Sequence, residues 1–238
     1  MSKSLYLRLE SLAAWVIPGE VVADVACDHG LLLETLLRQG VVPRGIGIDL
    51  REAPLERARR ALCGLNAELR LGDGLGPLRA GEAATAVIAG LHGQKIRRFV
   101  DQHGDKVRRL VLGPHGGDEL VRAGLPGWAV LAEQVVEEAG HLYPILVMEP
   151  GAERRSWLYY GDPARHVDRI RLAERVLRDR ERLSAIPSIA AHADPSGAAE
   201  IEGATATVPA ARDPRHARRT AERLAEATAV EAALATSP

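Results

Sequence analysis

The stretch that decides the fold is EVVADVACDHG, at residues 20–30. Residues 20–26 form a short apolar run rich in β-branched side chains, which predicts a buried strand. CDHG (27–30) ends this run, and the next segment, LLLETLLRQ (31–39), has apolar residues at helical spacing. A strand, a tight turn and a helix in this order are typical of the first unit of an α/β sheet.

The same alternation continues beyond this unit. Further strands are expected over residues 44–50, 67–71, 84–90 and 107–112. Other helices are expected over residues 5–16, 52–64, 93–103 and 117–124. Strands that alternate with helices predict a parallel sheet joined by right-handed crossovers.

Two extended runs follow with almost no linker, WAVLAEQVVEEAG (128–140) and HLYPILVME (141–149). Such close spacing predicts an antiparallel hairpin. The expected fold class is therefore α/β and Rossmann-like, with a mostly parallel seven-stranded sheet closed by the hairpin. Class I methyltransferases have this arrangement, whereas dinucleotide-dependent dehydrogenases usually lack the hairpin.

Pro150-Gly151 marks a boundary near the end of the expected sheet. We expect a cofactor-binding domain over residues 1–160 and a helical, coiled-coil-like extension over residues 161–238. Helical patterns cover residues 163–184 and about 213–235, and the segment between them is rich in Ala, Pro, Ser and Gly. The two helices favour a helical hairpin, and disorder around residues 188–211 is the alternative.

Composition places the chain among globular proteins, with 46 % hydrophobic residues, 26 % charged residues and a formal net charge of −1. RNA binding would therefore depend on a local basic patch. Cys27 and Cys63 match neither a zinc pattern nor a disulfide framework. No apolar run approaches the roughly 20 residues of a membrane span, and the first residues lack a signal-peptide pattern. We expect a cytoplasmic monomer or weak dimer, with no metal and no membrane association.

Ligands of doubly wound sheets bind beyond the carboxyl ends of the strands. The first strand and its turn supply Asp24, Ala26, Cys27, Asp28 and Gly30 at this edge. Small side chains let a cofactor approach the backbone. The alternative for Asp28 is that it only caps the helix that follows.

The next strand ends continue the pattern. Asp49 lies 25 residues after Asp24, where a carboxylate can accept hydrogen bonds from the ribose hydroxyls of an adenosine cofactor. Asp73-Gly74 follows the third strand and could receive the adenine amino group, although an Asp between glycines is also an ordinary turn residue. Ala89-Gly90-Leu91 follows the fourth strand, beside the expected position of the transferred methyl group.

The first turn lacks the G-x-G-x-x-G phosphate cradle of dinucleotide-binding proteins. S-adenosylmethionine (SAM) contains no pyrophosphate and does not need that cradle. The missing glycines therefore favour SAM over NAD as the cofactor.

These segments resemble the TrmK family of bacterial tRNA (adenine-N1)-methyltransferases. ADVACDH (23–29) is similar to the family's A-D-I-G-S-D-H, GDGL (72–75) to G-[ND]-G-L, and IAGLHG (88–93) to I-A-G-M-G-G. Leu7-Arg8-Leu9-Glu10 resembles an R-L-E helix at the family's N-terminus. The resemblance covers roughly residues 4–160 and implies a SAM-dependent enzyme that methylates N1 of an adenine in tRNA, of the adenine-22 type.

Two segments depart from the family pattern. His92 replaces a Gly, and Gly113-Pro114-His115 replaces Q-P-N near the expected acceptor base. The departures leave two alternatives open. One is a methyltransferase acting on another RNA or on a small molecule, and the other is a non-catalytic RNA-binding relative.

Methyl transfer to adenine N1 would use a carboxylate that stabilises the cationic product and accepts an amino hydrogen bond. We assign this role to Asp28, with His29 and His115 shaping the pocket. Arg8 would meet the cofactor carboxylate or an RNA phosphate. For both histidines, a loop histidine bonded to backbone is the alternative. Cys27 is expected to be a small packing residue and not a nucleophile.

RNA binding needs cations that meet phosphates. The candidates are Lys95, Arg97 and Arg98, Arg154 and Arg155, and a further cluster at Arg212, Arg215, Arg218 and Arg219. Each cluster has the alternative of being an ordinary solvated surface. Tyr159 and Tyr160 could supply a platform for base stacking.

Overall fold

The structure is a computed structural model that describes residues 7–123, 125–151, 160, 169–184 and 214–236. A seven-stranded sheet dominates it, with the strand order β3-β2-β1-β4-β5-β7-β6. The strands are β1 (Val22–Val25), β2 (Gly45–Asp49), β3 (Ala67–Leu71), β4 (Thr85–Ala89), β5 (Arg109–Gly113), β6 (Trp128–Glu138) and β7 (His141–Pro150).

The strand pairing confirms the predicted fold class. β1 pairs in parallel with β2 and with β4, so that Val25 lies between Ile48 and Ile88. β7 pairs antiparallel with both β5 and β6, and the register of β6 shifts between Val130 and Ala132. Because β1 and β4 are central, the turns after them lie where the strand order reverses, which is where α/β sheets bind ligands.

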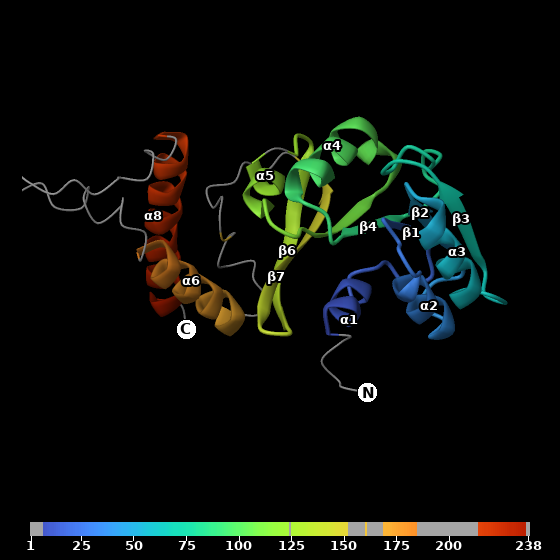
Figure 1. Cartoon of the computed structure of the whole chain (residues 1–238), viewed down its shortest axis with the longest axis horizontal. Helices are drawn as coiled ribbons and strands as arrows, with labels where there is room; N and C mark the ends of the chain where they lie inside the picture. Colours follow the sequence, from blue (N-terminus) through green and yellow to red (C-terminus); the bar gives the residue numbers. More distant parts are fainter. Residues whose placement is uncertain (1–6, 124, 152–159, 161–168, 185–213, 237–238) are drawn as a thin grey trace, which may run out of the picture.

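Helices cover both faces of the sheet (Figure 1). The helices in chain order are α1 (Leu7–Ala13), α2 (Leu31–Arg38), α3 (Glu52–Ala61), α4 (Gly93–His103), the short 3₁₀ helix η2 (Gly104–Lys106), α5 (Asp118–Ala123), α6 (Arg169–Ser184) and α8 (Pro214–Thr236). One core contains apolar side chains of α1, α2 and α3, and the second contains those of α4 and α5. Neighbouring strand residues alternate between these cores: Val87 joins the first core, while Ala86 and Ile88 join the second.

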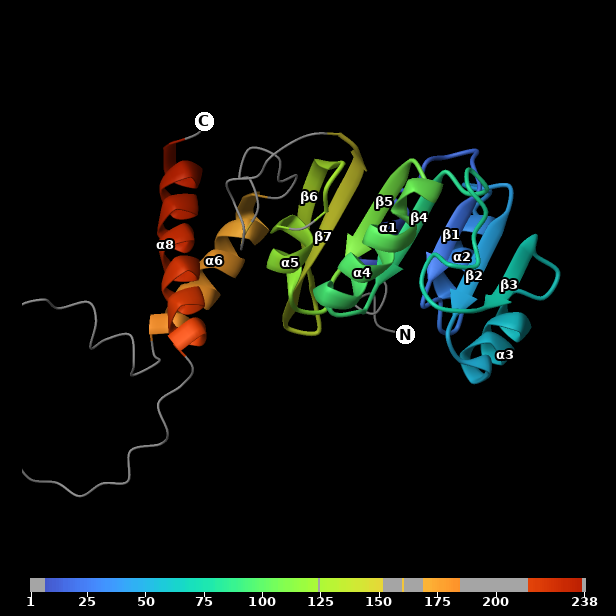
Figure 2. The same cartoon turned by 90° about the horizontal axis from the view of Figure 1, so that it is seen from above.

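The predicted helix boundaries are close to the observed ones. The helix predicted over residues 52–64 ends at Ala61, before Gly64. The segment around residues 188–211 lies outside the described residues. The predicted C-terminal helices are present as α6 and α8, which lie beside the β6–β7 end of the sheet in both views (Figures 1 and 2).

α6 and α8 have a small core of their own, formed by Tyr160, Leu172, Val176, Ala227 and Val230. Tyr160 is 0 % exposed. The prediction that Tyr160 offers a stacking platform is therefore wrong, because the ring packs between the helices of the extension.

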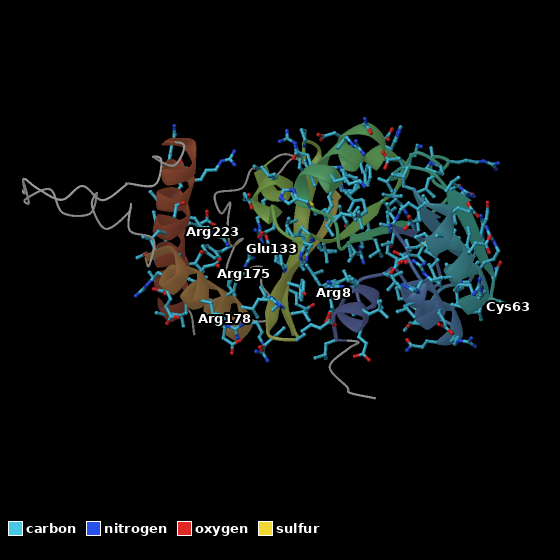
Figure 3. The ribbon with its side chains drawn as sticks, viewed as in Figure 1. Arg8, Cys63, Glu133, Arg175, Arg178 and Arg223 are labelled. Carbon is cyan, nitrogen blue, oxygen red and sulfur yellow. The ribbon has the colours of Figure 1, made fainter. Side chains whose placement is uncertain are left out.

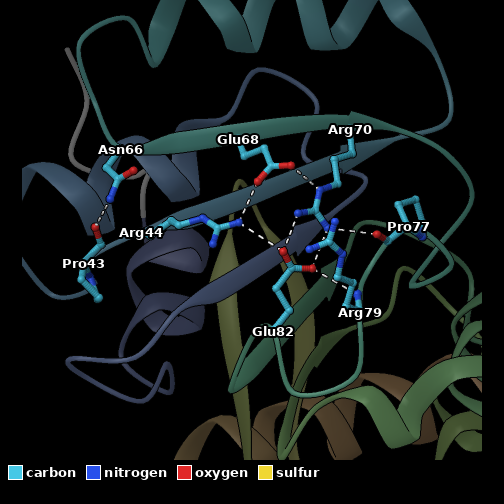
Figure 4. A network of polar contacts seen from close by, with 8 residues as sticks. All are labelled: Pro43, Arg44, Asn66, Glu68, Arg70, Pro77, Arg79 and Glu82. Carbon is cyan, nitrogen blue, oxygen red and sulfur yellow. Dashed lines mark hydrogen bonds and ion pairs between the residues drawn. The ribbon is translucent and has the colours of Figure 1, made fainter.

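A polar network stabilises the edge strand β3 (Figure 4). Arg70 donates hydrogen bonds of 2.6 and 2.7 Å to Glu82, and one of 2.8 Å to Glu68. Arg44, just before β2, binds the same two carboxylates. The hydrogen bonds from Arg70 lower the pKa of Glu82 to about 2. Because Glu82 lies between β3 and β4, these hydrogen bonds hold that segment against the edge strand.

Candidate active site at the carboxyl ends of the strands

A cleft of about 410 Å³, here called the main cleft, opens beyond the carboxyl ends of β1, β2 and β4. Its other walls come from α1 and from the tip of the β6–β7 hairpin. Ten of the predicted site residues line it: Arg8, Asp24, Ala26, Cys27, Asp28, His29, Asp49, Ala89, Gly90 and Leu91. The sheet topology therefore brings together residues that lie more than 80 positions apart in sequence.

The turn after β1 has an unusual backbone. Ala26 has φ 60°, Asp28 has φ 44° and Gly30 has φ 73°. A non-glycine residue in this left-handed region costs about 1–2 kcal/mol. The turn is fixed by hydrogen bonds from the N–H of Cys27 to the carbonyl of Ile48, and from the N–H of Gly30 to the carbonyl of Cys27. Backbone strain of this kind concentrates at binding sites.

Replacing Ala26 by glycine is expected to stabilise the protein by about 0.5–1 kcal/mol. Relief of the left-handed penalty exceeds the entropy that glycine gains in the unfolded chain. Urea denaturation would measure the difference in the free energy of unfolding between the variant and the wild type. Ala23→Gly is the matched control, because Ala23 is buried in β1 without a positive φ, so the substitution should destabilise. Equal losses of stability in Ala26→Gly and Ala23→Gly would contradict the assignment of backbone strain to Ala26.

Two buried carboxylates face the main cleft. Asp49 is 6 % exposed and accepts a hydrogen bond of 3.0 Å from the backbone N–H of Arg51. Asp24 is 7 % exposed, and its side chain forms no hydrogen bond or ion pair with any other residue that the structure describes. Burial, together with the charges of Asp49 and Asp28, raises the pKa of Asp24 to about 7. The cleft thus presents an acceptor group that requires a donor or a cation.

The carboxylate of Asp28 lies at the mouth of the main cleft. It is 3.2 Å from the guanidinium of Arg57 and 3.2 Å from Nε2 of His29, and both partners are half exposed. The N-cap of α2 is Gly30, and no side chain caps this helix. The alternative that Asp28 is only a helix cap is therefore wrong, and His29 contacts a carboxylate in place of backbone.

Gly30 does not line the main cleft. A Cβ atom at this position would lie 3.0 Å from Leu62 and 3.2 Å from Ala58. Its predicted cofactor contact is thus not supported by its position. Glycine is needed here because the backbone turns left-handed while it packs closely against α3.

A smaller cavity of about 230 Å³, here called the side cleft, continues the main cleft past β2. The two share Ala26, Asp49, Arg51 and Leu91. The predicted pair Asp73 and Gly74 lines the side cleft, together with the apolar side chains of Leu50, Leu91 and Phe99. Apolar side chains together with a carboxylate suit an aromatic ring that carries an amino group.

His115 lies in a third cavity, of about 470 Å³, between the loop after β5, the hairpin tip and the helices α6 and α8. We call it the hairpin cavity. The His115 ring is 5.9 Å from the ring of Tyr143, and the Arg8 guanidinium lies 4.7 Å from the same Tyr143 ring. Arg8 lines the main cleft and Tyr143 lines the hairpin cavity, so the contact between them separates the two cavities. The three predicted catalytic residues therefore do not share one cavity.

His92, one of the two departures from the TrmK pattern, lines none of these three cavities. Its Nδ1 accepts a hydrogen bond from the N–H of Gln94 and caps α4. Its ring covers Gly117, where a Cβ atom would lie 2.7 Å from it. His92 thus has a structural role, and the departure that reaches a cavity is His115.

The predicted RNA-binding cations have different surroundings. Lys95 lines the side cleft, while Arg98 pairs with Asp73 at 2.7 Å and Arg97 pairs with Asp101 at 3.4 Å. On α8, Arg218 pairs with Glu222. Several candidates lie outside the described residues or have side chains that the structure does not describe: Arg154, Arg155, Tyr159, Arg212 and Arg215.

Sequence reasoning missed Arg51, Glu138 and Tyr143. Arg51 lines both clefts, and its position directly after the second strand was a usable signal. Glu138 lines the main cleft and forms an ion pair of 3.7 Å with Arg8. Glu138 and Tyr143 come from the hairpin, where no motif marks them, so only the tertiary structure places them beside Arg8.

The thiol of Cys27 lines the main cleft in a buried position. Burial and the charges of Asp24 and Asp49 raise its pKa far above the usual range, so the thiol stays protonated and is poorly suited to nucleophilic attack. Among the described residues, no group of three or more His, Cys, Asp or Glu side chains could hold a metal ion. None of the described helices is long and apolar enough to cross a membrane.

Comparison with known proteins agrees with this geometry. A family model described as a methyltransferase domain matches residues 5–146. The tRNA (adenine(22)-N(1))-methyltransferase of Bacillus subtilis is 31 % identical over 153 residues, which are 60 % of this chain and 64 % of that protein. A putative tRNA methyltransferase of Mycoplasma pneumoniae is 30 % identical over 158 residues, covering 63 % of this chain and 74 % of that protein.

A crystal structure of Sp1610 from Streptococcus pneumoniae, a putative tRNA (m1A22) methyltransferase, has the same fold. It superposes with a TM-score of 0.76 at 24 % identity, over 97 % of this chain and 99 % of that one. Its complex with S-adenosyl-L-methionine gives a TM-score of 0.72 at 23 % identity, over 94 % of this chain and 97 % of that one. The chain therefore belongs to the methyltransferase domain family.

Proposed function

We propose that this chain is a SAM-dependent methyltransferase that methylates N1 of an adenine in tRNA, of the adenine-22 type, in the cytoplasm. The observation that carries the proposal is the main cleft, where the buried carboxylates of Asp24 and Asp49 line the same cavity as Arg8 at the switch point of the sheet. The relatives named above support the choice of tRNA as the substrate.

The residues present fit SAM. Asp49 would accept the ribose hydroxyls, and the slot between Leu50, Leu91 and Phe99 would hold the adenine ring near Asp73. Asp24, a buried carboxylate without a donor among the described residues, would accept the ammonium group of the methionine part. Arg8 would bind its carboxylate. When bound, SAM supplies a methyl group on a sulfonium, which is already a good leaving group.

The protein's own contribution is then to position the acceptor and to exclude water. Adenine N1 is paired in duplex RNA, so the target base must be unpaired or turned out of the helix. We assign Asp28 to accept a hydrogen bond from the adenine amino group and to stabilise the positive charge on the methylated ring. Its exposed position at the cleft mouth and its contact with His29 suit this role.

The RNA would lie across the mouth of the main cleft. Lys95, one of the predicted RNA-binding cations, lines the side cleft and would lie close to the path of the RNA. We also propose the division into a methyltransferase domain of residues 1–160 and a helical extension of residues 161–238. The separate core of α6 and α8 supports this division.

Titration of SAM into the wild-type protein and Asp49→Ala tests the cofactor. We expect saturable binding by the wild type and at least tenfold weaker binding by the variant, because two hydrogen bonds to a charged group are lost. Asp101→Ala is the matched control, since Asp101 lies exposed on α4 and pairs with Arg97. No binding by the folded wild-type protein would overturn the proposal.

Methyl incorporation into total tRNA tests the substrate. Labelled tRNA that carries 1-methyladenosine is the expected product. SAM binding without labelled tRNA would indicate either a small-molecule enzyme or a non-catalytic relative.

A further inference from the structure

The proposed function assigns no role to the hairpin cavity. At about 470 Å³ it is large enough for a nucleoside, and it borders the main cleft through Tyr143 and Arg8. Its walls include His115 and Tyr143 on one side and arginines of α6 and α8 on the other. Figure 3 shows Arg175, Arg178 and Arg223 between the helical extension and the sheet.

Arg175, whose side chain lines this cavity, has an unused donor group. The residue is 6 % exposed, and its Nη2 donates a hydrogen bond of 2.5 Å to Asp118. Its Nη1 is buried and has no hydrogen-bond acceptor among the residues that the structure describes. A buried guanidinium N–H without an acceptor is costly, and such groups in native proteins usually have a partner. A ligand that offers an acceptor atom would satisfy it.

The charges of the cavity favour a neutral ligand over a phosphate. Arg175 is paired with Asp118, and Arg223 is paired with Asp179. Arg178 lies 3.4 Å from Glu137, and Glu119 is a further acid in the wall. In the cavity lining itself, three acids (Asp118, Glu119 and Asp179) balance the three arginines, whereas a phosphate site needs surplus positive charge.

The aromatic side chains favour a flat ligand. His115 is exposed, and its ring is backed by Tyr143, while Tyr143 is contacted by the guanidinium of Arg8. Bases of single-stranded RNA are commonly held by stacking on such rings and by hydrogen bonds to their edges. A nucleobase would use both the exposed His115 ring and the free N–H of Arg175.

We propose that the hairpin cavity binds an unpaired nucleobase of the RNA substrate, next to the target adenine, which itself enters the main cleft. His115 stacks on this base, and Arg175 Nη1 donates to an acceptor on its edge, such as a purine N7 or a carbonyl oxygen. The inference rests on the proposed function. It makes Arg175, on the helical extension, a specificity-determining residue of the RNA site.

Equilibrium binding of unmodified tRNA to the full chain, followed by fluorescence anisotropy at several salt concentrations, tests the inference without requiring turnover. His115→Ala is expected to weaken tRNA binding about tenfold, as for loss of one stacked base. Arg175→Gln is expected to weaken it about fivefold or more. The dependence of log Kd on log salt should keep its slope in both variants, because no phosphate contact is lost.

Arg180→Gln is the matched control, since Arg180 lies on the same helix, pairs with Glu231 on α8 and does not line the cavity. It should leave the Kd unchanged. Wild-type affinity in folded His115→Ala would overturn the inference, and this variant removes only an exposed side chain. A salt slope lowered by about one in Arg175→Gln would also overturn it, because that result indicates a phosphate contact. Failure of the proposed function would appear separately, as absent SAM binding.

Discussion

Asp24→Asn is expected to stabilise the free protein at pH 8 and, at the same time, to weaken its binding of SAM. In the folded protein the pKa of Asp24 is raised from 3.8 to about 7 by burial and by the neighbouring charges of Asp49 and Asp28. Above pH 7 the folded protein must therefore hold a buried negative charge that the unfolded chain keeps in water. Asparagine has nearly the same shape and no charge.

The sign of the pH dependence follows from proton binding. Between about pH 4 and pH 7 the folded state holds a proton on Asp24 that the unfolded state has lost, so stability falls as the pH rises through this window. The loss is complete above pH 7 and is on the order of 4 kcal/mol, at about 1.4 kcal/mol for each pKa unit. Asparagine carries no charge, so the variant does not lose this stability. The free energies of unfolding of the two proteins should differ little at pH 4 and most at pH 8.

Urea denaturation at pH 4, 6 and 8 would measure the stability, and calorimetry would measure SAM binding. We expect wild-type affinity for SAM to fall below pH 7, because protonated Asp24 cannot pair with an ammonium group. The affinity of Asp24→Asn should be low and nearly independent of pH in this range. If the free energy of unfolding depended on pH in the same way in both proteins, the pKa of Asp24 would not be raised in the folded state.

Arg122→Met is expected to destabilise the protein by about 3–5 kcal/mol, the cost of removing one partner from a buried ion pair. The side chain of Arg122 is 0 % exposed and lies between two carboxylates. It donates hydrogen bonds of 3.1 and 3.0 Å to Glu133 on β6, and one of 2.6 Å to Asp118 on α5. Burial alone would raise the pKa of Asp118, but Arg175 and Arg122 outweigh it and hold this pKa well below its usual range.

The effect should extend beyond α5, because Asp118 is shared with Arg175 of α6. Glu133 and Arg175 lie close to the junction of the sheet and the helical extension (Figure 3). Thermal unfolding followed by circular dichroism would measure the loss. Arg38→Met is the matched control: its ion pair with Glu34 lies at the surface, so a small change is expected. Similar losses in both variants would show that the buried network does not stabilise the junction.

The hydrophobic pattern predicted the sheet well because each strand is short, buried and separated from the next by a helix. Residues 84–90 predicted a strand that the structure places at Thr85–Ala89, and the hairpin was predicted from two adjacent extended runs. In a parallel sheet the ends of all such strands meet at one edge. The positions of Asp24, Asp49 and Asp73 around neighbouring clefts therefore followed from their places after successive strands.

Expectation and structure differ most where a residue's neighbours come from distant segments. Tyr160 was expected at a binding surface, but packing with α6 and α8 buries it. Gly30 was expected at the cofactor, but the structure packs it against Ala58 and Leu62, outside the lining of the main cleft. His115 was expected beside Asp28, yet it lines a separate cavity together with the hairpin tip and α6. Local patterns contain no information about which loop lies against which helix.

The sequence by itself thus determined the α/β sheet, the edge at which the site forms and the acidic residues that face it, because these depend on local periodicity and on the order of strands. Only the tertiary structure decided that Asp24 is buried without a donor, that Tyr143 contacts Arg8, and that Arg175 of α6 binds Asp118 of α5. Burial, pKa and unpaired donors depend on contacts between segments far apart in the chain, and those contacts exist only after folding.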